Sequence, residues 1–448
     1  MIREPSGCRR LCNGQADSII QMRLLWPSVL ALALWILVLA APSYCASGYL
    51  KPGVRARVLE RAESDFHDGV ALYQERDYRG ALRKFLAAER ACPQLFSAGY
   101  HVALAHRKLG EEEAAVAQLK KLNGAFPENI IAHNDLGVIY AGRGKEDSDT
   151  EAAAELEVAI KNGESLLLGK ERKVPQVRVD LAMAHANLGA LQLRKSKLEN
   201  AEKSFRKAVE HYPHGFFGHF GLGNVLFAMN RLGEAKAAYL KAKQIEPKND
   251  SVHIALARCY LFGSERNPRF AIAELEKIKA ESAPAEVSDL FGDAYALLGN
   301  RQEAAKRYKQ HLSLPGRNRE ALYKLGAIYY NEKEFGQANK LLEGFVAESP
   351  KGGDGALPIA HKLLGDIATE QKDYQKAIVS YGEATKLRQH YFSCYYGLAE
   401  SYFHLEKYDE ARNYLRLVLE GLPERGNEEE NELRDKASEL LKKIPSEK

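Results

Sequence analysis

Five histidines share one position of a repeating sequence pattern, and histidine is the side chain best suited to metal ligation and proton transfer near neutral pH. Each lies four residues before a recurring glycine or alanine: His133, His185, His219, His253 and His361. Metal ligands must converge to within about 2 Å of one ion, whereas equivalent side chains on neighbouring packed helices lie on the order of 10 Å apart. We therefore predict that these histidines pack between helices and bind no metal.

The sequence contains no motif of a common catalytic site. It has no His-Glu-x-x-His zinc motif, no glycine-rich phosphate loop followed by Lys and Ser or Thr, and no Gly-x-Ser-x-Gly nucleophile turn. Paired carboxylates such as Glu111 and Glu113 lie at expected turns or helix starts, where negative charge suits the helix dipole. We expect a protein that is not an enzyme and that carries no cofactor and no metal.

The charge balance argues against nucleic acid as a partner. The 448 residues are 45% hydrophobic and 28% charged, and the formal net charge is only +4. A nucleic-acid-binding protein usually shows a basic patch or a long basic run, and the sequence has no long basic run. These values are ordinary for a folded soluble protein.

A sparse pattern recurs from about Ala62 to Arg425, mostly with a period of 34 residues. One repeat separates Gly189, Gly223 and Ala257, and likewise Phe205 and Tyr239, and Pro213 and Pro247. A period of this length indicates helix–turn–helix units that cannot bury their apolar faces alone and must stack. The prolines are expected to end the second helix of each unit, because proline cannot donate the next backbone hydrogen bond.

These positions resemble the tetratricopeptide repeat, whose loose signature is Leu-Gly followed by Tyr, Ala, Phe, Ala and Pro at fixed offsets. Leu136-Gly137, Leu325-Gly326 and Leu364-Gly365 open three of about ten copies. The resemblance implies an all-α, right-handed superhelical solenoid of about ten helix–turn–helix units, closed by a C-terminal capping helix. Together with the N-terminal segment described below, it suggests an exported member of the bacterial type.

The spacing of the copies predicts the organisation of the chain. We expect units 1–3 at 62–166, units 4–8 at 182–352, and units 9 and 10 at 358–425. Residues 167–181 match no repeat position, so either the second helix of the third unit is prolonged or a loop interrupts the stack. A glycine-rich interruption at 352–355 precedes the ninth unit, and residues 426–448 are predicted to form the capping helix and a tail.

The N-terminal residues 1–46 do not belong to the repeats. Leu24–Ala41 is apolar apart from Pro27 and Ser28, follows Arg23, and ends in small residues, as an export signal does. Its 18 residues also reach the lower limit for a membrane span, so an uncleaved membrane anchor is the alternative. We predict a periplasmic or secreted protein, and we hypothesise that translation begins at Met22.

In the family that the repeats resemble, ligands usually lie against the inner faces of the first helices, at offsets two, five, nine and twelve of each unit. The offsets select eight residues as candidate groove contacts: Phe217, Phe220, Asn224, Phe227, Tyr323, Tyr330, Tyr396 and Phe403. Exposed aromatic side chains are enriched among binding hot spots, although some of these rings could instead pack between first helices.

We therefore expect a non-catalytic scaffold that binds peptide or protein segments in a concave groove. The alternative is a membrane-anchored envelope assembly or secretion factor that uses the same repeats. In both cases the partner is a protein or peptide, and membrane contact occurs only through an uncleaved N-terminal segment.

Overall fold

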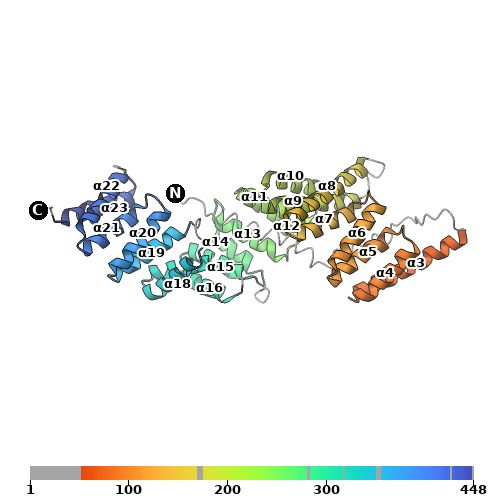
Figure 1. The fold of residues 1–448 in the computed structure, drawn as a ribbon, viewed down its shortest axis with the longest axis horizontal. Coiled ribbons are helices and arrows are strands. Elements are labelled where there is room, and N and C mark those ends of the chain that lie inside the picture. The colour runs from red at the N-terminus through yellow and green to blue at the C-terminus, as the bar shows by residue number, and fades with distance from the viewer. Residues whose placement is uncertain are drawn as a thin grey trace. The chain divides into compact units, whose positions relative to one another are not determined.

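A computed structural model of the chain describes residues 52–168, 175–279, 283–315, 318–349, 355–423 and 426–445. Within these ranges the chain forms α-helices and no β-strand (Figure 1). The predicted export segment Leu24–Ala41, the possible start at Met22 and most of the glycine-rich interruption lie outside the described residues. Among the helices described, none is both long and apolar enough to cross a membrane.

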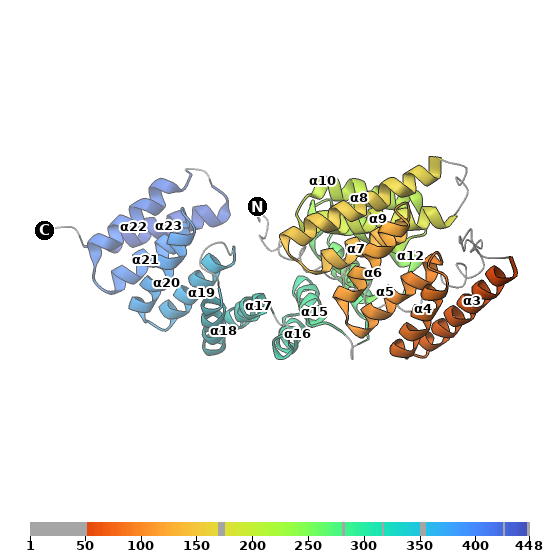
Figure 2. The same ribbon diagram turned by 45° about the vertical axis from the view of Figure 1, so that its right-hand side comes forward.

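The chain divides into two compact units, one up to Ala255 and one from Leu256, called here the N-terminal and C-terminal units. The described helices of the N-terminal unit are α3 (Pro52–Gln74), α4 (Tyr78–Ala91), α5 (Phe96–Leu109), α6 (Glu112–Ala125), α7 (Ile130–Gly142), α8 (Glu146–Leu168), α9 (Pro175–Arg194), α10 (Leu198–His211), α11 (Phe216–Ala228) and α12 (Leu232–Ile245). Each odd-numbered helix packs against the even-numbered helix that follows it (Figure 2).

The C-terminal unit continues the same alternation after α13 (Asp250–Phe262), which spans the division between the units. Its helices are α14 (Pro268–Leu275), α15 (Ala285–Leu297), α16 (Arg301–Ser313), α17 (Glu320–Asn331), α18 (Phe335–Ala347), α19 (Leu357–Glu370), α20 (Tyr374–Leu387), α21 (Phe392–His404), α22 (Tyr408–Gly421) and α23 (Glu428–Lys443). The described chain thus holds ten helix pairs and a closing helix, α23, which confirms the predicted all-α repeat architecture.

Short turns between paired helices follow from local backbone chemistry. Arg76 and Lys372 adopt left-handed backbone angles, with φ of 65° and 61°, two residues after the end of the first helix of their pairs. The next residue, Asp77 or Asp373, then caps the second helix by accepting a backbone N–H three residues on, at 2.9 and 3.1 Å. Such caps satisfy amide groups that the first helical turn leaves without partners.

The recurring glycines allow the two helices of a pair to approach closely. A Cβ atom on Gly223 would lie 2.5 Å from the ring of Tyr239, and one on Gly292 would lie 2.4 Å from the ring of Tyr308. Both tyrosines are buried, with exposed fractions of 1% and 2%. The repeat therefore places a large ring on the second helix against a residue without a side chain on the first.

First helices of successive pairs also contact one another, as α7, α9 and α11 do in the N-terminal unit and α17, α19 and α21 do in the C-terminal unit. Within each unit, second helices such as α4, α10, α16 and α20 pack on the first helix of their own pair and on that of the next pair. The accessible surface of the first helices is called here the first-helix face.

Helices α8 and α9 depart from the common length. The helix α8 has 23 residues and α9 has 20, whereas α10, α12 and α20 have 14 each. The predicted interruption at 167–181 therefore contains the end of a prolonged α8 and an early start of α9 at Pro175. Residues 169–174 between them lie outside the described ranges.

Candidate partner-binding face

The recurring histidines contribute to turns between pairs. His133, His219 and His253 each place Nε2 within 3.2, 2.8 and 3.0 Å of the carbonyl oxygen of the proline six residues earlier. A carbonyl oxygen only accepts, so Nε2–H donates in each case. His133, His185 and His253 are buried, in agreement with the packing role predicted for them. No group of His, Cys, Asp and Glu in the described chain could hold a metal ion.

In the N-terminal unit the predicted cluster on α11 is largely buried. Phe220, Asn224 and Phe227 expose 3%, 1% and 4% of their surface, while Phe217 is half-buried. The Oδ1 atom of Asn224 accepts a hydrogen bond of 2.7 Å from the hydroxyl of Tyr239. As folded, these three buried side chains offer a partner little area, and their contact with a ligand stays a prediction.

In the C-terminal unit the predicted residues are half-buried. Tyr323, Tyr330, Tyr396 and Phe403 come from the first helices α17 and α21. Each rests partly on its surroundings: the ring of Tyr323 lies 5.6 Å from that of Phe345, and the ring of Phe403 lies 5.9 Å from that of Tyr408. These aromatic side chains are thus held in position while part of their surface stays accessible, as a binding anchor requires.

A carboxylate that the offset reading did not single out joins three helices beside Tyr330. Asp366 on α19 accepts hydrogen bonds from the hydroxyls of Tyr330 and Tyr381, at 3.1 and 2.8 Å, and from Lys362 Nζ at 2.6 Å. Burial, and then the charge of Asp366, raises the pKa of Tyr330 above its ordinary value. Asp366 directly follows Gly365, so it lies at one of the offsets that selected the aromatic residues, and a search for charged residues there would have found it.

A second carboxylate lies between the two candidate aromatic residues of α21. Burial raises the pKa of Glu400 above its ordinary value; His404 and Lys436 act against this shift, while Asp366 and Glu370 add to it. Burial and the charge of Glu400 also raise the pKa of Tyr396 to about 12. The first-helix face of this unit therefore combines half-buried aromatic rings with negative charge.

A third polar cluster fixes α15 against α17. Lys324 Nζ donates to Asp289 at 3.1 Å and to Asp293 at 2.9 Å, and the hydroxyl of Tyr308 donates to Asp293 at 2.7 Å. Burial, together with the neighbouring Asp289, raises the pKa of Asp293, although Lys324 opposes the shift. Burial alone would lower the pKa of Lys324, but the two carboxylates outweigh this and raise it.

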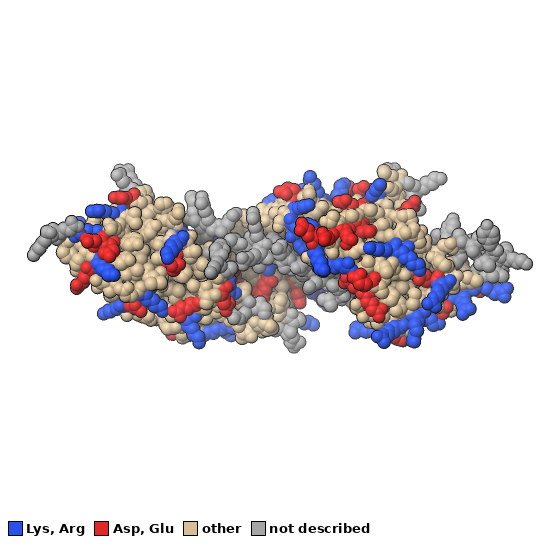
Figure 3. Space-filling view, viewed as in Figure 1, with Lys and Arg blue, Asp and Glu red and all other residues tan. Residues whose placement is uncertain are grey.

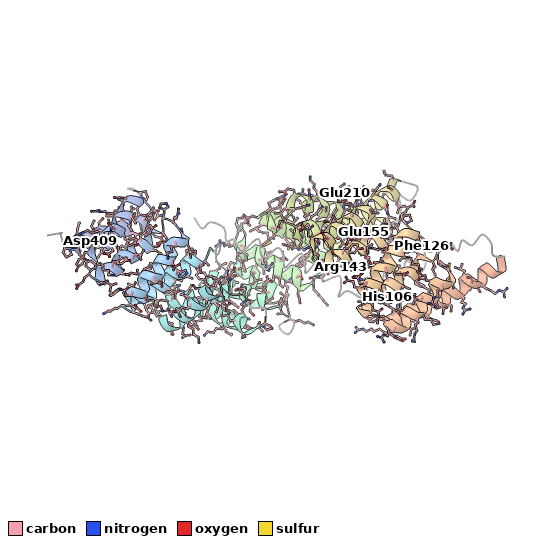
Figure 4. The ribbon with its side chains drawn as sticks, viewed as in Figure 1. His106, Phe126, Arg143, Glu155, Glu210 and Asp409 are labelled. Carbon is pink, nitrogen blue, oxygen red and sulfur yellow. The ribbon has the colours of Figure 1, made fainter. Side chains whose placement is uncertain are left out.

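Acidic and basic side chains both occur over each unit on the face shown in Figure 3. Ion pairs account for part of this mixture: Arg143 binds Glu112 and Glu113 at 2.9 and 2.6 Å, and Arg412 binds Asp409 at 3.1 Å. Arg143 and Asp409 are labelled in Figure 4, in the N-terminal and C-terminal units respectively.

Helix pairs of this kind, with a glycine on one helix facing a ring on the next, define a class of repeat protein. Family models described as tetratricopeptide repeat match residues 187–251, 320–352 and 368–426. The chain thus contains tetratricopeptide repeats in both units, as its sequence pattern suggested.

Among curated proteins, the human protein O-mannosyl-transferase TMTC3 is 23% identical over 232 residues, covering 50% of this chain and 25% of that protein. Human DnaJ homolog subfamily C member 3 is 25% identical over 233 residues, covering 50% of this chain and 38% of that protein. The chain therefore spans between a quarter and two fifths of the curated relatives that it matches.

Solved structures of low sequence identity also align with the chain. The Cut9 and Hcn1 hetero-tetramer of the APC/C aligns with a TM-score of 0.42 and 16% identity, covering 87% of this chain and 84% of that one. Pseudomonas aeruginosa PilF aligns with a TM-score of 0.43 and 19% identity, covering 51% and 99%. Yeast Tom70 aligns with a TM-score of 0.38 and 13% identity, covering 85% and 96%.

Proposed function

We propose that the chain is a non-catalytic scaffold that holds a peptide or protein segment against the first-helix face of its C-terminal unit. The observation that carries this proposal is the set of half-buried aromatic side chains at Tyr323, Tyr330, Tyr396 and Phe403 beside the half-buried carboxylates of Asp366 and Glu400. Stacked repeats provide extended surfaces of this kind for binding other chains. Tyrosine in particular combines apolar contact area with a polar tip.

The charge of this face favours a segment that carries basic side chains. Asp366 already binds Lys362, whereas Glu400 lies half-buried with its pKa raised by burial, so a cation would stabilise its charged form. A lysine or arginine of the partner could also lie over the ring of Tyr396 or Phe403, an arrangement that contributes about 0.5–2 kcal/mol. We propose aromatic contacts for affinity and Glu400 for selection of a positive charge.

We also propose that the chain is exported. The apolar run Leu24–Ala41 with its preceding arginine supports an export signal, and the same run supports an anchor if it stays uncleaved. N-terminal sequencing of the mature protein distinguishes the two outcomes. A mature chain that begins near Tyr44 indicates cleavage, and a membrane-bound chain that retains the run indicates an anchored factor.

Site-specific photo-crosslinking in the cells that produce the protein tests the binding face. Photoreactive p-benzoylphenylalanine replaces Tyr396 or Phe403 in the full chain, and in a matched control it replaces Val379, a 65% exposed residue of the second helix α20. We expect positions 396 and 403 to crosslink to the same partner segment and position 379 to give no such product. Crosslinks of equal yield from position 379 would place the partner elsewhere.

Once that segment is identified, substitution measures the contribution of each contact. Phe403→Ala and Tyr396→Ala should each weaken binding by about tenfold or more, because truncating a hot-spot aromatic costs about 1–2 kcal/mol or more. Glu400→Gln should weaken the binding of a basic segment. It should leave unchanged the affinity for a variant of that segment that lacks the positive charges. Unchanged affinity in all three variants, with unchanged helicity, would contradict the proposed face.

A further inference from the structure

His185 occupies the recurring histidine position but lacks the proline carbonyl that three of its counterparts bind. In His133, His219 and His253 the Nε2–H group donates to a proline carbonyl six residues earlier. His185 is buried to the same extent, with an exposed fraction of 7%. Its Nε2 atom nevertheless has no hydrogen-bond partner among the described residues.

The departure of α8 and α9 from the common length explains this loss. The prolines that serve the other histidines lie in the short turn before a first helix, as Pro213 does between α10 and α11. Six residues before His185 the chain is already inside α9, at Val179. The prolonged helices thus replace the turn that would have supplied the carbonyl, and the imidazole keeps its place without an acceptor.

A surface hollow of about 330 Å³ lies at this position. Its walls come from α8, α9 and α10, and the residues used below are Glu157, Lys161, Glu164, His185, Lys203 and Lys207. Two of these helices are second helices, so the hollow is distinct from the first-helix face. Its volume is at the lower end of the range known for ligand sites, which suits a small molecule or one side chain.

The polar groups of the hollow favour a negatively charged acceptor. Three lysines and two glutamates line it, and two of the lysines, Lys161 and Lys203, lie where they can face a ligand. Lys207 donates to Glu210 at 2.9 Å, and Glu210 is labelled on α10 in Figure 4. Lys161 and Lys203 are exposed at the rim, and their flexible stems allow their ammonium groups to reach an incoming anion.

A second histidine lies against the first. The rings of His185 and His211 stack with centroids 5.5 Å apart and planes 7° from parallel, and His211 Nδ1 also has no partner within the part of the chain that the structure describes. Burial lowers the pKa of His185 to about 4, with smaller contributions from His211 and Lys207, so the ring is neutral at pH 7. A neutral imidazole carries its proton on one ring nitrogen, and with the proton on Nε2 this atom is a donor that needs an acceptor oxygen.

We propose that this hollow binds a carboxylate group, carried by a small acid or by an acidic side chain of another protein. One carboxylate oxygen takes the place of the missing proline carbonyl on His185 Nε2, and Lys161 and Lys203 balance its charge. Because Nε2 is covered in the structure, binding includes a movement of the side chains around it. The carboxylates of Glu157 and Glu164 on α8 repel any second negative charge of the ligand that lies near that helix.

Histidine NMR of the full chain tests this site. The protein is labelled with ¹³C at histidine Cε1 and titrated at pH 7 with succinate and, separately, with a blocked Ala-Asp-Glu-Ala peptide. We expect a saturable shift of the His185 signal, which His185→Gln identifies by its loss. His253, whose Nε2 is bonded to Pro247, is the internal control and should not move.

The double variant Lys161→Gln, Lys203→Gln removes positive charge at exposed positions and should leave the fold intact. Its dissociation constant should rise by about tenfold or more, because hydrogen bonds to charged groups contribute about 1.5–3 kcal/mol. A shift with succinate indicates a small-acid ligand, and a shift with the peptide alone indicates a protein side chain. No shift of His185 with either probe, an equal shift of His253, or an unchanged dissociation constant in the double variant would each overturn the proposal.

Discussion

Acidification should destabilise the first repeats of the N-terminal unit through one buried histidine, His101 on α5. Its exposed fraction is 5%, and its Nδ1–H donates to the backbone carbonyl of Ser97 at 2.7 Å. The ring lies 5.0 Å from that of Phe66 and 5.1 Å from that of Phe85. Its Nε2 has no partner in the described chain, so a proton added there would be buried among aromatic rings.

The size of the effect follows from the pKa of His101. Burial lowers it from 6.5 to about 4, although the bond to Ser97 acts in the opposite direction. Between these two pH values the unfolded chain binds a proton that the folded chain refuses, so the free energy of unfolding falls as the pH falls. The stabilising effect of the neutral ring is complete above about pH 6.5 and lost by about pH 4, and the difference corresponds to about 3 kcal/mol.

Two measurements on the full chain test this reasoning. The NMR titration of His101 Cε1 gives its pKa directly. Hydrogen exchange of α3–α6 at pH 7 and pH 4.5, corrected for intrinsic rates, gives the local free energy of opening. It is measured in the wild type, in His101→Phe and in the control His67→Gln, which alters an exposed histidine of the neighbouring first helix. We expect His101→Phe alone to reduce the acid sensitivity. A measured pKa near 6.5, or equal acid sensitivity in all three proteins, would refute the burial argument.

Two further predictions concern the C-terminal unit. Gly292→Ala should lower the free energy of unfolding by about 1–3 kcal/mol, because its Cβ would lie 2.4 Å from the ring of Tyr308. In the control Gly382→Ala in α20, the new Cβ meets nothing within 4 Å, and the free energy of unfolding should rise by up to about 1 kcal/mol. Thermal unfolding measures both changes, and a stabilising Gly292→Ala would contradict the close approach. Lys324→Met should cost about 3 kcal/mol at pH 7, because it leaves Asp289 and Asp293 buried without their cation. Since burial raises the pKa of Asp293, protonation should reduce this cost at pH 5, and urea unfolding that shows the same cost at both pH values would contradict that account.

The sequence predicts the helix pairs because their contacts recur at a fixed spacing. Gly223 and Tyr239 stand 16 residues apart in one pair, and Gly292 and Tyr308 repeat that spacing in another. A small residue and a large ring at this distance imply one close approach in every unit. The capping helix α23 was predictable for a related reason, since the last pair would otherwise leave an apolar surface uncovered, and Leu440 is buried on that helix.

The site was less predictable, because the bond between Tyr330 and Asp366 joins two successive helix pairs. Tyr330 binds Asp366 from 36 residues away, and Tyr381 binds the same carboxylate from 15 residues away. Reading one repeat at a time identifies positions on a helix face but not the partner that a neighbouring unit supplies. The same offsets selected Phe220 and Phe403, although the first is buried and the second is half-buried.

The bonds from histidine to proline show what a repeat pattern can and cannot reveal. The spacing of six residues was visible in the sequence at 127 and 133, 213 and 219, and 247 and 253, but the bond itself depends on a turn that brings the two groups together. Where longer helices replace that turn, the histidine is retained and its acceptor is lost. A polar group that a regular repeat would satisfy is then left without a partner among the described residues. Such a break in periodicity is therefore a physical reason to look for binding at His185, independent of the aromatic face formed by regular repeats.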